Sequence, residues 1–149
     1  MTRLFIAVTD SPFPNLDPAT QVLSEMNADL KLARGTSPEE ILEIAREADG
    51  LLVCYAKVTA DMIAQMKRCK VIARFGIGVD SVDIDAATAA GIIVTNVPEY
   101  CEDEVSDHAM ALLMALIRKI PFSNKLTHSG TWSMPAVVPE PPPSSRRSV

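Results

Sequence analysis

A chain of 149 residues, 48% of them apolar, can bury one hydrophobic core but is too short for two full domains. Its net charge of −5, with basic residues only in scattered pairs, argues against a polyanion partner, so we expect no nucleic acid. Three widely spaced cysteines match neither a disulfide framework nor a zinc site, which predicts a cytoplasmic location and no bound metal. The apolar runs are too short for a signal peptide or a membrane span.

Short apolar runs alternate with helical patterns along the chain, and this alternation predicts a parallel sheet covered by helices. Strands are expected at 4–8, 29–33, 51–55, 71–75 and 92–97, and helices at 16–26, from Pro38 to Gly50, at 60–68 and from Asp83 to Ala90. Ser37 and Glu40 form a capping box ahead of the second helix, Thr59 caps the third, and Gly91 ends the fourth. The predicted fold is α/β, a doubly wound five-stranded sheet in the order 2-1-3-4-5.

A long helix is expected over 103–120. Acidic residues at its start and basic residues at its end complement the helix dipole, and Pro121 is expected to end it. Its middle is apolar on all sides, so it needs neighbours, and we expect a homodimer through this helix. The proline-rich segment 135–149 is expected to be disordered.

The turn Gly76-Ile77-Gly78 follows one predicted strand and precedes a helix. It lacks the third glycine of a dinucleotide fingerprint, because Ser81 stands there, so a self-sufficient dinucleotide site is not expected. Two glycines allow a ligand to approach the backbone closely, and the N–H groups of 76–79 then face an anion such as a carboxylate. The alternative is a tight turn without a ligand.

The segment RFGIGVDSVDIDAATAAGIIVTNVP, followed by VSDHAMALLMALIRKIP and GTW, resembles the catalytic domain of the D-isomer-specific 2-hydroxyacid dehydrogenases. The resemblance covers residues 1 to about 132 and is closest to the branch with phosphoglycerate-dehydrogenase-like and C-terminal-binding-protein-like members. It implies a flavodoxin-like substrate domain, an NAD or NADP cofactor, and hydride transfer at a small 2-hydroxy or 2-oxo acid.

The resemblance also implies a set of substrate-binding residues. They are Tyr55, Ala56 and Lys57 in the loop after the third strand and Gly76, Ile77 and Gly78 in the glycine turn, with Ile77 also near the cofactor. The family's catalytic His, its partner Glu, its substrate-binding Arg and its GxGxxG loop match nothing before the chain stops. No catalytic residue is therefore assigned, His108 and His128 are not taken as replacements, and tight NAD(P) binding is not expected.

Three hypotheses follow for the whole chain. The first is a truncated dehydrogenase, inactive alone, with a substrate domain at 1–101, a crossover helix and the start of a cofactor domain at 102–134, and the tail at 135–149. The second is a non-catalytic module of the corepressor-like branch that binds a peptide or metabolite. The third is a free-standing flavodoxin-like regulator; its receiver type is disfavoured because Val8-Thr9-Asp10 lacks paired acids.

Overall fold

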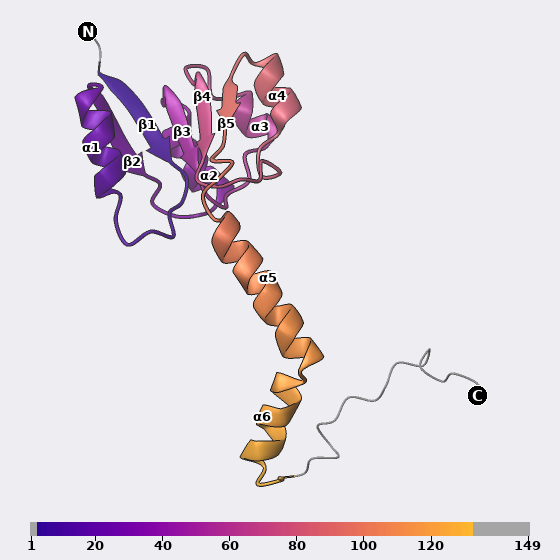
Figure 1. Ribbon diagram of the computed structural model, residues 1–149. Coiled ribbons are helices and arrows are strands. Elements are labelled where there is room, and N and C mark those ends of the chain that lie inside the picture. Colours follow the sequence, from indigo (N-terminus) through magenta and orange to yellow (C-terminus); the bar gives the residue numbers. More distant parts are fainter. Residues whose placement is uncertain (1–2, 133–149) are drawn as a thin grey trace. The chain divides into compact units, whose positions relative to one another are not determined.

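The computed structural model describes residues 3–132 of the chain, so the predicted disordered tail at 135–149 lies outside the described residues. The chain divides into two compact units, the first ending at Tyr100 and the second starting at Cys101 (Figure 1). Assignment of the second unit to the start of a cofactor domain stays a prediction.

The first unit is built around a five-stranded sheet in the order β2-β1-β3-β4-β5. Its strands are β1 (Leu4–Val8), β2 (Ala28–Leu32), β3 (Gly50–Val53), β4 (Val71–Arg74) and β5 (Ile93–Thr95). Every pairing is parallel, with Val8 beside Leu32 and Leu51 beside Ile72. The predicted fold class and strand order are confirmed.

The second and third helices begin at the predicted caps, Ser37 and Thr59, and four helices in the described residues alternate with the strands. They are α1 (Asp17–Glu25), α2 (Pro38–Ala45), α3 (Ala60–Ile63) and α4 (Ile84–Ala89). The capping box of α2 is complete, since Ser37 Oγ accepts the Glu40 N–H and Glu40 Oε2 accepts the Ser37 N–H. Gly91, with a φ of 69°, ends the turn after α4 in the left-handed conformation that favours glycine.

The hydrophobic core lies between the sheet and the side chains of α2, α3 and α4. Its fully buried large side chains are Ile41, Leu51, Ile72, Val53 and Val58. Helix α1 packs against β2 at the edge of the sheet and buries no residue fully. The core therefore fixes the central strands β1, β3 and β4 most firmly, and those strands carry the candidate site.

Two strands end two residues earlier than predicted because the residues at their carboxyl ends form other contacts. The strand expected at 51–55 ends at Val53, since the next N–H groups turn away from the ladder toward the carboxylate of Asp10. The strand expected at 92–97 ends at Thr95, and the Val97 N–H beyond it donates to the Gly76 carbonyl.

Three helices also differ from the prediction. The helix expected from Pro38 to Gly50 ends at Ala45, beyond which the Ala48 N–H donates to the Ala45 carbonyl in a tighter turn. The helix expected at 60–68 ends at Ile63, because the chain tightens into three-residue turns, with the Met66 N–H donating to the Ile63 carbonyl. The helix expected at 103–120 is instead α5 (Glu102–Ile117) followed by α6 (Ile120–His128), with Lys119 in a left-handed conformation between them. Pro121 therefore starts α6 and does not stop α5, because a first-turn residue needs no N–H partner.

Candidate functional site

The two loops singled out in the sequence lie together at the carboxyl edge of the sheet. Val58 follows the loop after β3, and its N–H donates to the Ser81 carbonyl at 2.7 Å, while its carbonyl accepts the Asp83 N–H at 3.0 Å. These bonds join the segment 54–58 to the segment 76–83. Tyr55 and Lys57 are exposed, Ala56 is half-buried, Gly76 is buried, and Ile77 and Gly78 are exposed.

The glycine turn is held by its carbonyl groups. The Gly76 carbonyl accepts the Val97 N–H at 3.1 Å, and the Ile77 carbonyl accepts Nδ2 of Asn96 at 2.8 Å. Within the described part of the chain, the N–H groups of Gly76, Ile77 and Gly78 have no acceptor. The turn is thus fixed from one side and leaves three successive donors for an anion.

Nothing in the fold itself requires glycine at 76 or 78. Neither residue has a positive φ. A Cβ would lie 3.5 Å from Nη2 of Arg74 at the first position and 3.4 Å from Oδ2 of Asp80 at the second, which are ordinary contacts. Gly78 is exposed, so the space above it is open to a molecule that approaches the backbone, whereas Gly76 is buried beside Arg74.

Arg74, the last residue of β4, brings a positive charge to this edge. Its Nη1 donates to Oγ of Ser81 at 2.6 Å, so the serine at the position of the missing third glycine holds the guanidinium. Among the described residues the buried Nε of Arg74 has no hydrogen-bond partner. A half-buried guanidinium with unpaired N–H donors can bind a carboxylate or phosphate group.

Asp10, two residues beyond β1, binds the backbone of the loop after β3. Its Oδ1 accepts the N–H groups of Cys54 and Ala56, both at 3.2 Å, and its Oδ2 accepts the Tyr55 N–H at 2.7 Å. The buried hydroxyl of Thr9 donates to Oδ1 as well. Two of the three loop residues expected to contact a ligand through the backbone therefore give their N–H groups to Asp10.

The pKa values follow from these contacts. Burial opposes ionisation of Asp10, but the hydrogen bonds from Thr9 and from the N–H groups of Tyr55, Ala56 and Cys54 outweigh it, so the pKa of Asp10 lies below its ordinary value. Burial raises the pKa of the Cys54 thiol, Asp10 raises it further, and Arg74 opposes both. Cys54 is therefore a neutral thiol and does not supply a nucleophile.

A hollow of about 360 Å³ borders Asp10 at the ends of β1, β2 and β3. It is lined by residues 9–12, residues 32–36 and Tyr55. On the side of β4, Phe13 meets Phe75 edge to face, with ring centroids 5.5 Å apart. The loop after β1 thus reaches across the carboxyl edge to the residue before the glycine turn.

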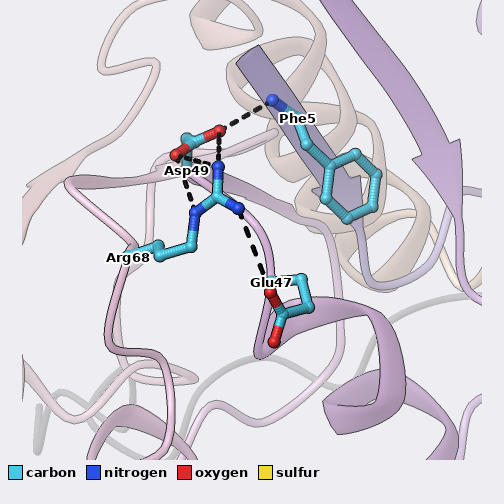
Figure 2. A network of polar contacts seen from close by, with 4 residues as sticks. All are labelled: Phe5, Glu47, Asp49 and Arg68. Carbon is cyan, nitrogen blue, oxygen red and sulfur yellow. Dashed lines mark hydrogen bonds and ion pairs between the residues drawn. The ribbon is translucent and has the colours of Figure 1, made fainter. Parts of the chain in front are cut away.

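A second carboxylate, Asp49, lies at the opposite, amino edge of the same strands (Figure 2). Its Oδ2 accepts the Phe5 N–H at 2.9 Å, and Nη2 of Arg68 contacts its Oδ1 at 2.9 Å. The Phe5 N–H bond lowers the pKa of Asp49, burial opposes that effect, and Arg68 reinforces it. This network links the starts of β1 and β3 to the segment before β4.

The remaining chemistry-bearing residues form no second site in the described part of the chain. His108 lies within α5, and His128 ends α6 with its Nδ1 2.9 Å from the Asn124 carbonyl. Between residues 3 and 132, no three His, Cys, Asp or Glu side chains are arranged to hold a metal. No helix in that range is both long and apolar enough to cross a bilayer.

Sequence reasoning missed Asp10, Arg74 and Ser81 as members of the site. One signal was available for Arg74, since it is a charged residue inside the otherwise apolar run VIARF. Asp10 lies two residues after a predicted strand, but only the pairing of the strands shows that it meets the loop 54–56.

Comparisons with known proteins agree on the kind of chain this is. The family model of the D-isomer specific 2-hydroxyacid dehydrogenase catalytic domain matches residues 6–137. The D-3-phosphoglycerate dehydrogenase of Methanocaldococcus jannaschii is 39% identical over 128 residues, which are 85% of this chain and 24% of that protein. The chain spans about a quarter of the length of such curated relatives.

Solved structures show the same fold. An acyclic imino acid reductase in complex with NADPH and D-Arg matches 92% of this chain and 45% of its own, with a TM-score of 0.78 and 23% identity. The D-lactate dehydrogenase of Aquifex aeolicus, complexed with NAD and lactic acid, matches 87% of this chain and 38% of its own, with a TM-score of 0.74 and 22% identity.

Proposed function

The chain belongs to the D-isomer specific 2-hydroxyacid dehydrogenase family, and from this membership we propose that it supplies the acid-binding part of an NAD(P)-dependent oxidoreductase. Its substrate is a small 2-hydroxy or 2-oxo acid. One observation carries the proposal: the N–H groups of Gly76, Ile77 and Gly78 have no acceptor among the described residues, and the guanidinium of Arg74 lies beside them.

The mechanism assigned to these residues is recognition of the acid. The carboxylate accepts hydrogen bonds from the three turn N–H groups, and Arg74 supplies the positive charge that favours an anion over a neutral analogue. Because the turn is held through its carbonyls by Asn96 and Val97, its donors are already oriented before the ligand arrives. Lys57, on the neighbouring loop, faces solvent and adds a second cation at the edge.

The described residues do not fit a dinucleotide at this turn. Ser81 occupies the position of the third glycine, and its hydroxyl is bonded to Arg74. Helix α4, which follows, has only 6 residues, and Asp83 Oδ1 already accepts the Ala86 N–H at its start. A pyrophosphate would meet a carboxylate there instead of free helix N–H groups. We therefore place hydride transfer with NAD(P) outside the chemistry of these residues, and Ile77 remains a proposed neighbour of the nicotinamide.

The test is equilibrium binding of pyruvate to the purified chain, with NADH turnover measured in parallel. Arg74→Met should weaken pyruvate binding at least about tenfold, the loss expected for one charged hydrogen-bonding partner. Arg46→Met is the matched control, since Arg46 follows α2, bonds to Gln65 after α3, and takes no part in the glycine turn, so its loss should leave binding unchanged. No NADH consumption above background is expected from the chain alone. Failure of the wild type to bind pyruvate contradicts the proposal.

We also propose that a second copy of this chain covers α5. The helix has no buried residue, and Met110, Leu113, Met114 and Ile117 are each about half exposed. Burial of one such side chain contributes about 1.5–3 kcal/mol before the costs of association. Sedimentation should show a wild-type dimer and a monomeric Leu113→Glu, Ile117→Glu variant. A wild type that stays monomeric at high concentration contradicts this part.

A further inference from the structure

The backbone N–H groups of residues 54–56, after β3, and the Thr9 hydroxyl together form a small anion-binding site, which we call the anion seat. The carboxylate of Asp10 occupies it. Four donors converge on it: the N–H groups of Cys54, Tyr55 and Ala56 and the hydroxyl of Thr9. No Lys, Arg or His in the described range forms an ion pair with it. The seat is therefore made of neutral donors, as backbone nests for anions are.

Occupation of this seat by the chain's own carboxylate has a consequence for an acid ligand. The N–H groups of Tyr55 and Ala56 are unavailable to it, whereas those of Gly76, Ile77 and Gly78 are free. The loop itself is held at two ends, by Asp10 at residues 54–56 and by the Val58–Ser81 bond at its far side. Without Asp10, three N–H groups at the edge of the sheet would compete with the glycine turn for the same kind of group.

We propose that Asp10 is the positioning residue of the acid site: its carboxylate fills the anion seat after β3, fixes the loop 54–57, and leaves the glycine turn as the single seat for the substrate carboxylate. This inference rests on the proposed function for its ligand. Its structural half, that the loop depends on a carboxylate in the seat, stands independently of any ligand.

Chemical rescue tests the structural half. Asp10→Ala removes the carboxylate and leaves a space that formate can fill with the same two oxygen atoms. Amide hydrogen exchange of Tyr55 and Ala56, followed by NMR, should speed up about tenfold to a hundredfold in Asp10→Ala, the range for loss of hydrogen bonds to a charged group. Formate should restore most of the protection. Acetamide, which is neutral, should not.

Two further variants keep the test decisive. Asp10→Asn retains Oδ1 for Cys54, Ala56 and Thr9 but presents an amide group to the Tyr55 N–H, so exchange of Tyr55 alone should accelerate. The Asp10→Asn variant replaces Asp10→Ala in the exchange experiment if Asp10→Ala does not fold. Asp49→Ala is the matched control, because it removes a carboxylate that binds a backbone N–H at the amino edge. In this variant, formate should not change the amide exchange of residues 54–56.

Pyruvate titration of the same samples tests the ligand half. In the wild type, pyruvate should shift only the amide signals of 76–78. In Asp10→Ala it should also shift those of 54–56, and formate should abolish that second set.

Unchanged exchange at Tyr55 and Ala56 in both Asp10 variants overturns the positioning role, whatever pyruvate does. If exchange is faster in Asp10→Ala and formate does not restore the protection, the positioning role is also overturned. The loop would then depend on the volume of the Asp10 side chain and not on its carboxylate. If exchange behaves as expected but wild-type chain binds no pyruvate, the proposed function fails and the seat for Asp10 remains.

Discussion

Two carboxylates at opposite edges of the same sheet are used in different ways. At the amino edge, Asp49 accepts the Phe5 N–H and is also paired with Arg68, which lies 3.9 Å from Glu47 as well (Figure 2). At the carboxyl edge, Asp10 receives only neutral donors, and the nearby guanidinium of Arg74 is bonded to Ser81 instead. At the amino edge the carboxylate has an ion-pair partner, whereas at the carboxyl edge neither Asp10 nor Arg74 forms an ion pair among the described residues.

The difference separates a structural edge from a binding edge. The amino edge joins β1, β3 and the segment before β4 into a network in which each charge has a partner. The carboxyl edge keeps free N–H groups at 76–78 and a buried Arg74 Nε without a partner in the described residues. Unsatisfied donors in a folded protein cost stability unless a ligand or water takes them, so their concentration at one edge indicates a binding function.

Filling the glycine turn should have the largest effect on this contrast. Gly78→Trp is compatible with the backbone, because φ is not positive and a Cβ meets only Asp80 at 3.4 Å, but the ring covers the free N–H groups. Pyruvate binding should fall below detection while the free energy of unfolding changes by less than about 1 kcal/mol. Lys70→Trp, at an exposed position directly before β4 at the amino edge, is the control and should still bind. Equal losses in both variants would mean that the effect is general damage.

Loss of the amino-edge carboxylate should affect stability and not binding. Asp49→Asn weakens the bonds to Phe5 and Arg68, and we expect the free energy of unfolding to fall by about 1–2 kcal/mol, since the pair is partly exposed. Urea denaturation measures the fall. A variant that is as stable as wild type but binds pyruvate less tightly would reverse the roles assigned to the two edges.

Acid should weaken both edges, each as its own carboxylate is protonated, and the two losses should be seen at different amides. The pKa of each carboxyl is lower in the folded chain than the ordinary 3.8, so its stabilisation is complete above that value and is lost as pH falls through the lowered pKa. Amide signals of Tyr55 and Ala56 should follow Asp10, and that of Phe5 should follow Asp49. Asp10→Asn should abolish only the first titration. A midpoint above 3.8 at residues 55–56 contradicts the hydrogen-bonded seat.

Salt should produce the smallest difference. The Asp49–Arg68 pair is a partly exposed ion pair, worth about 0.2–1 kcal/mol, and salt at about 1 M should screen most of it. The stability gap between wild type and Asp49→Asn should narrow accordingly, whereas the gap between wild type and Asp10→Asn should stay constant. Denaturation at low and high salt compares the two gaps.

The fold was predictable because local signals and long-range pattern agree. The caps at Ser37 and Thr59 are read directly from residue type, and the structure confirms both and adds Asp83 as the cap of α4. Pro121 was misread, because a proline is compatible with both the end of one helix and the first turn of the next, and only the backbone at Lys119 decides between them.

The site was predictable in part. The glycine turn is a contiguous motif, and Ile77 and the loop 55–57 followed from the family resemblance; their binding roles stay predictions. Asp10 meets the loop 54–56 only because β1 and β3 are neighbours in the sheet. Arg74 and Ser81 lie on one local segment, the end of β4 and the turn after it, but their contact belongs to no motif that the sequence shows. Residues brought together by strand pairing leave no spacing signal in a single sequence.

The most direct measurement is a pyruvate titration of the ¹⁵N-labelled wild-type chain, monitored at every backbone amide. The account predicts saturable shifts at Gly76, Ile77 and Gly78, and no response at Phe5 or the other amides of the amino edge. Shifts that do not saturate, or that appear equally at both edges, would contradict the claim that the free donors of the carboxyl edge form an acid site.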